Sequence, residues 1–301
     1  MIKATVKDER LLTHKTECLI LFSIEEKNPS GKLAELDTKL KGIIKSLFKN
    51  KRFEGKLNQT LLLNVAKPIQ ADHLLLVGLG KGIEITADKL RQAAGTAAKY
   101  AEKSGLETIS FHVPADDAGK AIYAGLVKSD ENFVQTVVEG GLLSLHHFDD
   151  YKQPAKEKTS RIKQIFLLAN LKSQVVSMRS AVSRGQKLVS AVTASRDLIS
   201  QPSNTATPSY LADKAREFAK SFGMTCKVLT TNDMKRLGMG ALLGVAKGSE
   251  EPPAFIILEH HGGTKDDPPI VIIGKGITFD TGGISLKPPP NMDEMKMDMS
   301  G

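Results

Sequence analysis

The sequence contains no tryptophan and only two cysteines among its 301 residues. Cys18 and Cys226 are too few and too far apart for a disulfide framework, which fits a reducing compartment such as the cytosol. Neither a CxxC nor an HExxH pattern occurs, and no internal repeat or low-complexity segment is visible. These absences argue against a disulfide-stapled scaffold and against the zinc sites that such motifs build.

Long apolar runs are also missing. No stretch approaches 18 consecutive apolar residues, so we expect no membrane span. The first ten residues, MIKATVKDER, lack the apolar core of a secretory signal peptide. We therefore expect a cytoplasmic protein.

Aromatic residues make up only 5% of the chain, whereas the formal net charge is +8. A basic balance keeps nucleic acid in view as a partner, and a non-catalytic binding module is the alternative reading of the chain. The densest basic run is Lys39, Lys41, Lys45, Lys49, Lys51 and Arg52, without interleaved aromatics or a nucleic-acid motif. It is more typical of a solvated helix face, so nucleic acid is not the expected partner.

The remaining composition, 41% hydrophobic and 25% charged, is that of a globular protein large enough for two domains. Short apolar runs alternate with segments of helical apolar spacing, which predicts an α/β fold. The N-terminal half yields strands over 17–23, 60–65, 73–78 and 108–113, and helices over 32–48, 88–104, 118–126 and 133–145.

Residues 149–161 are polar and lose periodicity, which indicates a domain boundary and predicts domains of 1–160 and 161–301. Thr207 before Pro208 is a helix start signal for 208–221. The other elements expected here are a strand over 163–169, a long helix over 173–199, and strands over 225–230, 254–260 and 270–275. The last two strands are continuous apolar runs, the form of strands buried on both faces.

The chemistry concentrates between residues 275 and 298. Lys275, Asp280, Lys287 and Asp298 lie within 24 positions, among glycines and prolines that disfavour regular structure. Taken singly, each has an ordinary reading as a solvated side chain or a turn residue. Together, two carboxylates and two amines indicate a candidate metal or anion site. Asn291 and Glu294 resemble a capping pair for a short helical turn that carries methionines 292, 295 and 299.

Other motifs are weaker. Gly78-Leu79-Gly80-Lys81-Gly82 follows a predicted strand but lacks the third glycine of GxGxxG, so phosphate binding is not supported. His260-His261 precedes Gly262-Gly263 and is typical of an exposed turn.

The stretch VIIGKGITFDTGGISLKP followed by MDEMKMDM closely resembles the signature of the leucyl (cytosol) aminopeptidase family of dinuclear-metal exopeptidases. HLLLVGLGK, RDLISQPSN and MGALLGVAKGSEEPPAFIILEH also look like that family. The resemblance implies a macro-like N-terminal α/β domain and the first part of a catalytic α/β domain with a mixed central sheet. It further implies a homo-hexamer that acts on peptides, prefers N-terminal leucine and uses two divalent ions, manganese or zinc.

The resemblance also assigns roles to individual residues. Lys275 would be a metal ligand through its neutral amine, Asp280 would bridge the two ions, and Asp298 would bind one ion and face the substrate's N-terminal amine. Lys287 would be the catalytic cation, and Met295 would line the pocket for the N-terminal side chain. The family's later Asn-Thr-Asp-Ala-Glu-Gly-Arg motif does not occur here, so this sequence resembles a truncated member and we expect impaired hydrolysis.

Overall fold

The computed structural model describes residues 2–65, 67–114, 130–153, 161–169, 171–264 and 267–301. The chain divides into two compact units, residues 1–193 and 194–301. The helix predicted over 118–126 lies outside the described residues.

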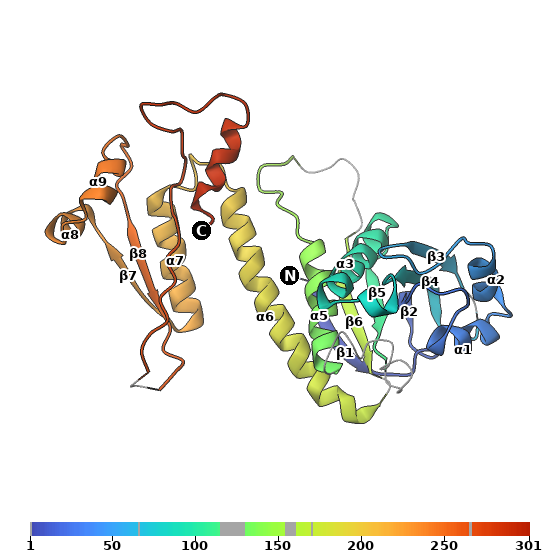
Figure 1. The fold of residues 1–301 in the computed structure, drawn as a ribbon. Coiled ribbons are helices and arrows are strands. Elements are labelled where there is room, and N and C mark those ends of the chain that lie inside the picture. The colour runs from blue at the N-terminus through green and yellow to red at the C-terminus, as the bar shows by residue number, and fades with distance from the viewer. Residues whose placement is uncertain (1, 66, 115–129, 154–160, 170, 265–266) are drawn as a thin grey trace. The chain divides into compact units, whose positions relative to one another are not determined.

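A six-stranded sheet forms the centre of the first unit (Figure 1). Its spatial order is β1-β6-β5-β2-β4-β3, and every strand is parallel to its neighbours except β3, which pairs antiparallel with β4. The strands are β1 (Lys3–Asp8), β2 (Thr16–Ser23), β3 (Thr60–Asn64), β4 (Ala71–Gly78), β5 (Thr108–His112) and β6 (Gln164–Ala169). The α/β class and the four strands predicted in the N-terminal half are confirmed, and β1 was not predicted.

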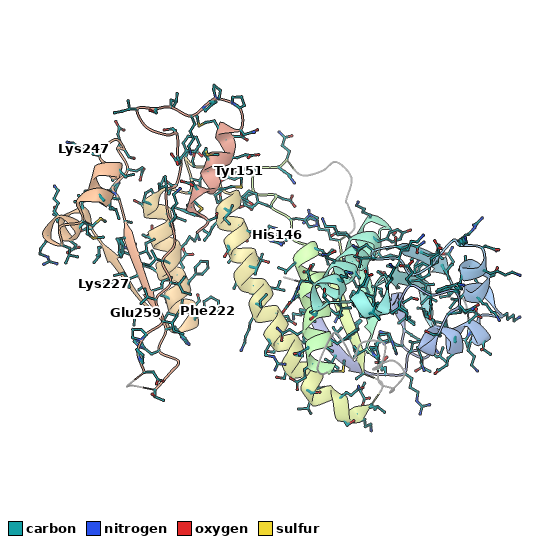
Figure 2. The ribbon with its side chains drawn as sticks, in the orientation of Figure 1. His146, Tyr151, Phe222, Lys227, Lys247 and Glu259 are labelled. Atoms are coloured by element: carbon teal, nitrogen blue, oxygen red, sulfur yellow. The ribbon has the colours of Figure 1, made fainter. Side chains whose placement is uncertain are left out.

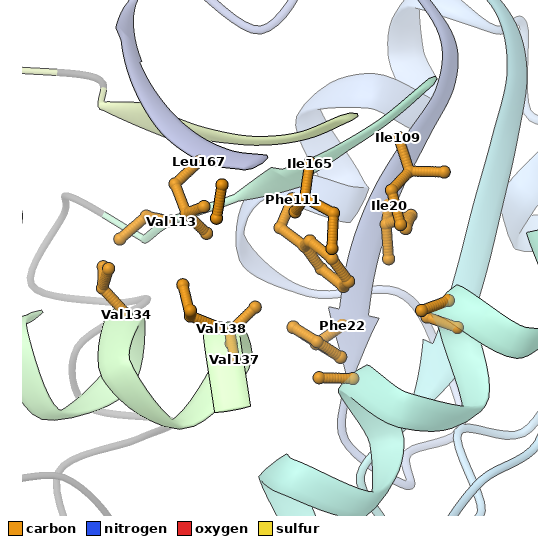
Figure 3. Packing of buried hydrophobic residues seen from close by; sticks show 14 of the residues in the cluster. Ile20, Phe22, Ile109, Phe111, Val113, Val134, Val137, Val138, Ile165 and Leu167 are labelled. Carbon is orange, nitrogen blue, oxygen red and sulfur yellow. The ribbon is translucent and has the colours of Figure 1, made fainter. Parts of the chain in front are cut away.

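Alternating side chains divide this unit into three layers. In β2, Ile20 and Phe22 enter one apolar cluster while Leu19 and Leu21 enter another, because successive strand residues point to opposite faces. The first cluster also contains residues of α3 (Ala87–Lys103) and α5 (Asp130–Ser144), and residues between 175 and 189 of α6 (Val175–Ser200). Figure 3 shows part of it, where the rings of Phe22 and Phe111 stack with centroids 5.8 Å apart. Burial on both faces explains the continuous apolar runs of the central strands.

The second cluster lies under α1 (Gly31–Lys39) and α2 (Ile43–Lys49). The single helix predicted over 32–48 is therefore wrong. Lys41 and Gly42 both have positive φ, 54° and 82°, which ends α1 and redirects the chain into α2. The buried carboxylate of Asp37 accepts a hydrogen bond from the Lys45 backbone N–H (3.0 Å) and fixes this corner. The lysines of this basic run, at 39, 41, 45, 49 and 51, are exposed, as the solvated-face interpretation predicts.

The second unit begins within α6 and continues with α7 (Pro208–Phe222), whose predicted N-cap is confirmed. The Thr207 hydroxyl accepts a hydrogen bond from the Tyr210 backbone N–H at 3.2 Å. Strands β7 (Thr225–Leu229) and β8 (Phe255–Glu259) pair antiparallel, and α8 (Thr231–Arg236) and α9 (Gly240–Ala246) lie between them in the chain. Figure 2 labels Lys227 on β7 and Glu259 on β8.

Two predictions fail in this unit. The run 270–275 forms no regular strand, and Ile270 and Ile272 are 93% and 91% exposed. β8 is a strand but is not buried on both faces, because Phe255 and Leu258 remain 37% and 44% exposed. The apolar pattern is that of a buried strand, but burial requires strand neighbours and covering layers. Within the described part of this unit, β8 has β7 as its strand neighbour.

The predicted boundary near residues 149–161 lies partly outside the described residues. β6 follows it in the chain and pairs with β1 and β5 in the first unit. The domain limits 1–160 and 161–301 stay a prediction. Among the described helices, none combines the length and apolar character that crossing a membrane requires.

Candidate functional site

The four charged residues singled out in the sequence form two ion pairs in the second unit. The Lys275 ammonium contacts the Asp298 carboxylate, and Lys287 Nζ lies 2.8 Å from Asp280 Oδ2. Asp298 and Asp280 are 22% and 28% exposed, so both carboxylates are partly withdrawn from water. The structure thus brings together side chains that are separated by irregular backbone in the sequence.

Asp280 is the most strongly held of these groups. Its Oδ1 accepts a hydrogen bond from the Gly282 backbone N–H at 2.9 Å, while Oδ2 faces Lys287. The hydrogen bond from Lys287 lowers the pKa of Asp280 below its ordinary 3.8, and the Gly282 N–H and the charge of Lys275 act in the same direction. Asp280 is therefore a carboxylate at neutral pH, as a metal ligand or an ion-pair partner must be.

The loop from Thr281 to Lys287 turns back on itself and carries Lys287 to Asp280. The Lys287 backbone N–H donates to the Thr281 carbonyl at 2.9 Å, which closes the loop. Gly282 has φ 94°, and a Cβ there would lie 2.5 Å from the Ser285 carbonyl oxygen. Only glycine allows this close approach without displacing backbone. Three prolines, 288–290, follow Lys287 and limit the freedom of the chain beyond it.

The segment after the prolines forms η3, a 3₁₀ helix over Met292–Met299. Met295 Sδ lies 3.1 Å from Lys287 Nζ, so η3 brings an apolar side chain next to the amine of the loop. A second contact joins the Met295 carbonyl to the Asp280 backbone N–H at 3.4 Å. The short helical turn is confirmed, but the capping pair is wrong. Asn291 adopts φ 61° and makes no side-chain cap, and the Glu294 backbone N–H bonds to the Asn291 carbonyl instead.

The donor chemistry fits a hard divalent cation in part. Carboxylate oxygens are the ligands such ions prefer, and Asp280 and Asp298 supply two carboxylates near two lysines. Each carboxylate is paired with an ammonium that a cation would have to displace. The described residues contain no group of three or more histidine, cysteine, aspartate or glutamate side chains arranged to hold a metal. Asp280, Asp298 and the Lys275 amine, the predicted metal ligands, lie close to ammonium or carboxylate partners, and their role as ligands stays a prediction.

Two further sequence features have no part in this cluster. His260 and His261 are exposed after β8, as the turn interpretation predicts. The Gly78–Gly82 stretch belongs to the first unit, where a Cβ at Gly78 would lie 1.9 Å from the Lys56 carbonyl oxygen. Close backbone packing explains that glycine without a ligand.

Sequence reasoning missed Lys296, which donates to the Ser200 carbonyl at 2.9 Å. It also missed Gly274, where a Cβ would lie 2.3 Å from the Gly301 carbonyl oxygen. A lysine between two methionines and a glycine before Lys275 give no signal in one sequence, since both contacts involve backbone that is distant along the chain.

Comparison with known proteins places the cluster in a family context. Residues 19–155 match the N-terminal domain of the cytosol aminopeptidase family, and residues 193–301 match its catalytic domain. The four charged residues and Met295 all fall in the catalytic-domain match.

Curated relatives agree. A probable cytosol aminopeptidase of Geotalea uraniireducens is 41% identical over 269 residues, covering 89% of this chain and 52% of the relative. One from a Geobacter species is 36% identical over 301 residues, covering 100% of this chain and 58% of the relative. The chain thus spans about half the length of the curated relatives it matches.

Solved structures share the fold. The bottromycin maturation enzyme BotP, in a complex with Mn, is 26% identical with a TM-score of 0.71, over 95% of this chain and 53% of that one. A mutant of tomato leucine aminopeptidase is 23% identical with a TM-score of 0.81, over 100% of this chain and 57% of that one, and shows the fold alone. Both family domains, the relatives and the fold agree, and the chain belongs to the cytosol aminopeptidase family.

Proposed function

We propose that this chain forms part of a metal-dependent aminopeptidase that releases N-terminal residues, leucine preferred, from peptides. The observation that carries the proposal is the pairing of Asp280 with Lys287 and of Asp298 with Lys275 in the stretch that matches the catalytic domain. A cluster of two carboxylates and two amines on irregular backbone is a site for charged chemistry rather than a packing device.

In this proposal Asp280, Asp298 and the Lys275 amine would hold two divalent ions, manganese or zinc. The Mn complex of BotP supports a divalent cofactor for a related fold. Bound ions would polarise the scissile carbonyl and lower the pKa of a water nucleophile. Lys275 would then have to release its proton and leave Asp298, whose carboxylate it now neutralises.

Lys287 and Met295 act on the substrate in this proposal. The Lys287 ammonium is fixed by the closed loop and by Asp280, and a fixed cation can stabilise negative charge that develops on the carbonyl oxygen. Met295 lies beside that ammonium and is half-buried, so its flexible thioether can form the wall of an apolar pocket. Together they would place a leucine side chain next to the polarised carbonyl.

The described donors also predict that residues 1–301 by themselves bind metal weakly and hydrolyse peptides poorly. Two carboxylates, each facing an ammonium, are fewer hard ligands than a divalent ion needs for tight binding. The chain spans 52% and 58% of the lengths of the two curated relatives.

The test is a Mn²⁺ titration of residues 1–301, followed by paramagnetic broadening of the aspartate signals and by leucine amide hydrolysis. Asp280→Asn and Asp298→Asn should each weaken Mn²⁺ binding about tenfold or more, because each removes a carboxylate ligand. Asp293→Asn is the matched control, since Asp293 is exposed on the same turn. Lys287→Met should leave Mn²⁺ binding in place and abolish any residual turnover.

Robust Mn²⁺-dependent turnover by residues 1–301 would contradict the expected impairment. Equal broadening of Asp293 and Asp298 would contradict the assignment of the ligands. Salt-sensitive retention on DNA without Mn²⁺ binding would instead favour the binding-module alternative. We also propose the family's cytoplasmic location, which cell fractionation would test, and a homo-hexamer, which sedimentation equilibrium would test.

A further inference from the structure

The two functional side chains of η3 share one face of that helix. A 3₁₀ helix has about three residues per turn, so side chains three positions apart are aligned. Met295 and Asp298 form one such row and meet Lys287 and Lys275, respectively. The orientation of η3 about its axis therefore decides whether both contacts form at once.

The next row, Lys296 and Met299, attaches η3 to the rest of the unit. Met299 is 9% exposed and is the buried residue of η3. Lys296 Nζ donates a partly buried hydrogen bond to the Ser200 carbonyl at 2.9 Å. Ser200 is the last residue of α6, where the backbone carbonyls lack intrahelical donors.

The end of α6 is a site that favours a cation. The helix dipole places partial negative charge at the C-terminus, and the last turn of α6 contains no basic residue of its own. Lys296 provides the positive charge from η3, 96 residues further along the chain. The bond combines a charged donor with the electrostatic preference of the helix end.

We propose that Lys296 is a positioning residue that fixes the rotation of η3 against α6 and thereby presents Met295 and Asp298 to the site. The inference rests on the proposed function for its consequence, because Asp298 is there a metal ligand and Met295 a pocket wall. The buried thioether of Met299 is flexible and tolerates sliding, whereas a charge-assisted hydrogen bond to one carbonyl is directional. Lys296 is thus the contact that selects one orientation.

The experiment compares Lys296→Met, Lys296→Arg and the control Lys247→Met in residues 1–301. Lys247 lies directly after α9 in the same unit and is exposed (Figure 2). Hydrogen exchange over 291–301 and the ¹³C signal of the Asp298 carboxyl are the two measurements. Lys296→Met should exchange about fivefold faster over 291–301 and shift the Asp298 signal, since one charged contact to the helix end is lost.

Lys296→Arg should stay close to wild type because its guanidinium can donate to the same carbonyl, and Lys247→Met should change neither measurement. A merely structural role would leave the Asp298 signal in place while the unit remains folded. Unchanged exchange and an unchanged Asp298 signal in Lys296→Met overturn the proposal.

If Lys296→Met unfolds the unit, a measurement on the wild-type protein can still test the proposal. The Lys296 ammonium protons should exchange more slowly than those of Lys247, and equal rates overturn the proposal. Absence of Mn²⁺ binding by wild type would count against the proposed function but would leave these measurements, and the orientation of η3, unaffected.

Discussion

At the scale of single residues, the site depends on glycines as much as on charged groups. Gly282 provides the positive φ and the close approach to Ser285 that close the loop carrying Lys287. Gly274 lets the Lys275 segment lie against Gly301, three positions after Asp298. Both glycines position an amine opposite a carboxylate, so their contribution to the site is geometric.

Gly282→Ala should open this loop. An alanine at φ 94° is strained by about 1–2 kcal/mol, and its Cβ would also meet the Ser285 carbonyl oxygen at 2.5 Å. We expect faster hydrogen exchange over 280–288 and loss of the 2.8 Å Lys287–Asp280 pair. Gly276→Ala is the control, because its Cβ would meet nothing within 4 Å. Equal exchange in the two variants would show that the close approach is not required.

Asp149 gives a prediction for acid pH in the first unit. Hydrogen bonds from Arg161 and then Lys152 lower the pKa of Asp149 from 3.8 to about 2. Because the folded state favours the ionised form of Asp149, this carboxylate contributes to the free energy of unfolding above pH 3.8. That contribution is lost as the pH falls from 3.8 through about 2.

Arg161→Met should raise the pKa of Asp149 toward 3.8, because it removes the first of the two donors. A ¹³C titration of the carboxyl measures it. Lys163→Met is the control, since Lys163 pairs with Glu107 at 2.5 Å instead. If the pKa of Asp149 is the same in wild type and in Arg161→Met, the hydrogen bond from Arg161 is not the cause of the lowered pKa.

At the scale of elements, short sequence motifs predicted a helix start correctly where the stabilising contact lies within a few residues of the motif. The Thr207-Pro208 start of α7 is confirmed because an N-cap bonds within three residues of itself. The break between α1 and α2 was missed because Gly42 lies within a continuous pattern of helical apolar spacing. That pattern indicates which residues face the core. It does not reveal a turn between two helices whose apolar residues enter the same cluster.

Thr207→Ala should destabilise α7 by about 1 kcal/mol, since it leaves the Tyr210 N–H without its side-chain acceptor. Thr207→Ser keeps the hydroxyl and should recover most of that loss. Urea unfolding followed by circular dichroism, with hydrogen exchange over 208–222, measures the difference. If serine and alanine destabilise equally, the hydroxyl is not the stabilising group.

At the scale of the whole molecule, the two units differ in how much apolar surface they bury. In the first unit both faces of the sheet are covered by helices and crossovers. In the second unit β8 and the segment 268–279 line an open apolar groove, with Ile272 and Ile273 91% and 89% exposed. Contiguous exposed apolar surface of this kind favours association.

Residues 1–301 should therefore self-associate through the second unit, and Ile272→Lys should reduce this self-association. The added charge interrupts the apolar run without disturbing a buried contact, because Ile272 is 91% exposed. Ile83→Lys is the matched control, as Ile83 is a 97% exposed isoleucine in the first unit, outside this run. Sedimentation velocity over a range of concentrations measures the difference. A monodisperse wild type, or equal effects of the two substitutions, would contradict the expectation.

The sequence alone determined the elements whose partners are near in the chain and singled out the charged residues of the cluster. The α/β class, α7 with its cap, and the motif around Lys275, Asp280, Lys287 and Asp298 could be predicted, because periodicity, capping and resemblance are properties of local sequence. The tertiary structure decided which residues pair. Asp298 meets Lys275 across 23 positions, Lys296 reaches Ser200 across 96, and Ile270–Lys275 remains outside any strand. Those outcomes depend on segments that are distant along the chain. A strand or an ion pair is stabilised by the partner segment with which it interacts, and the sequence of one segment does not reveal that partner.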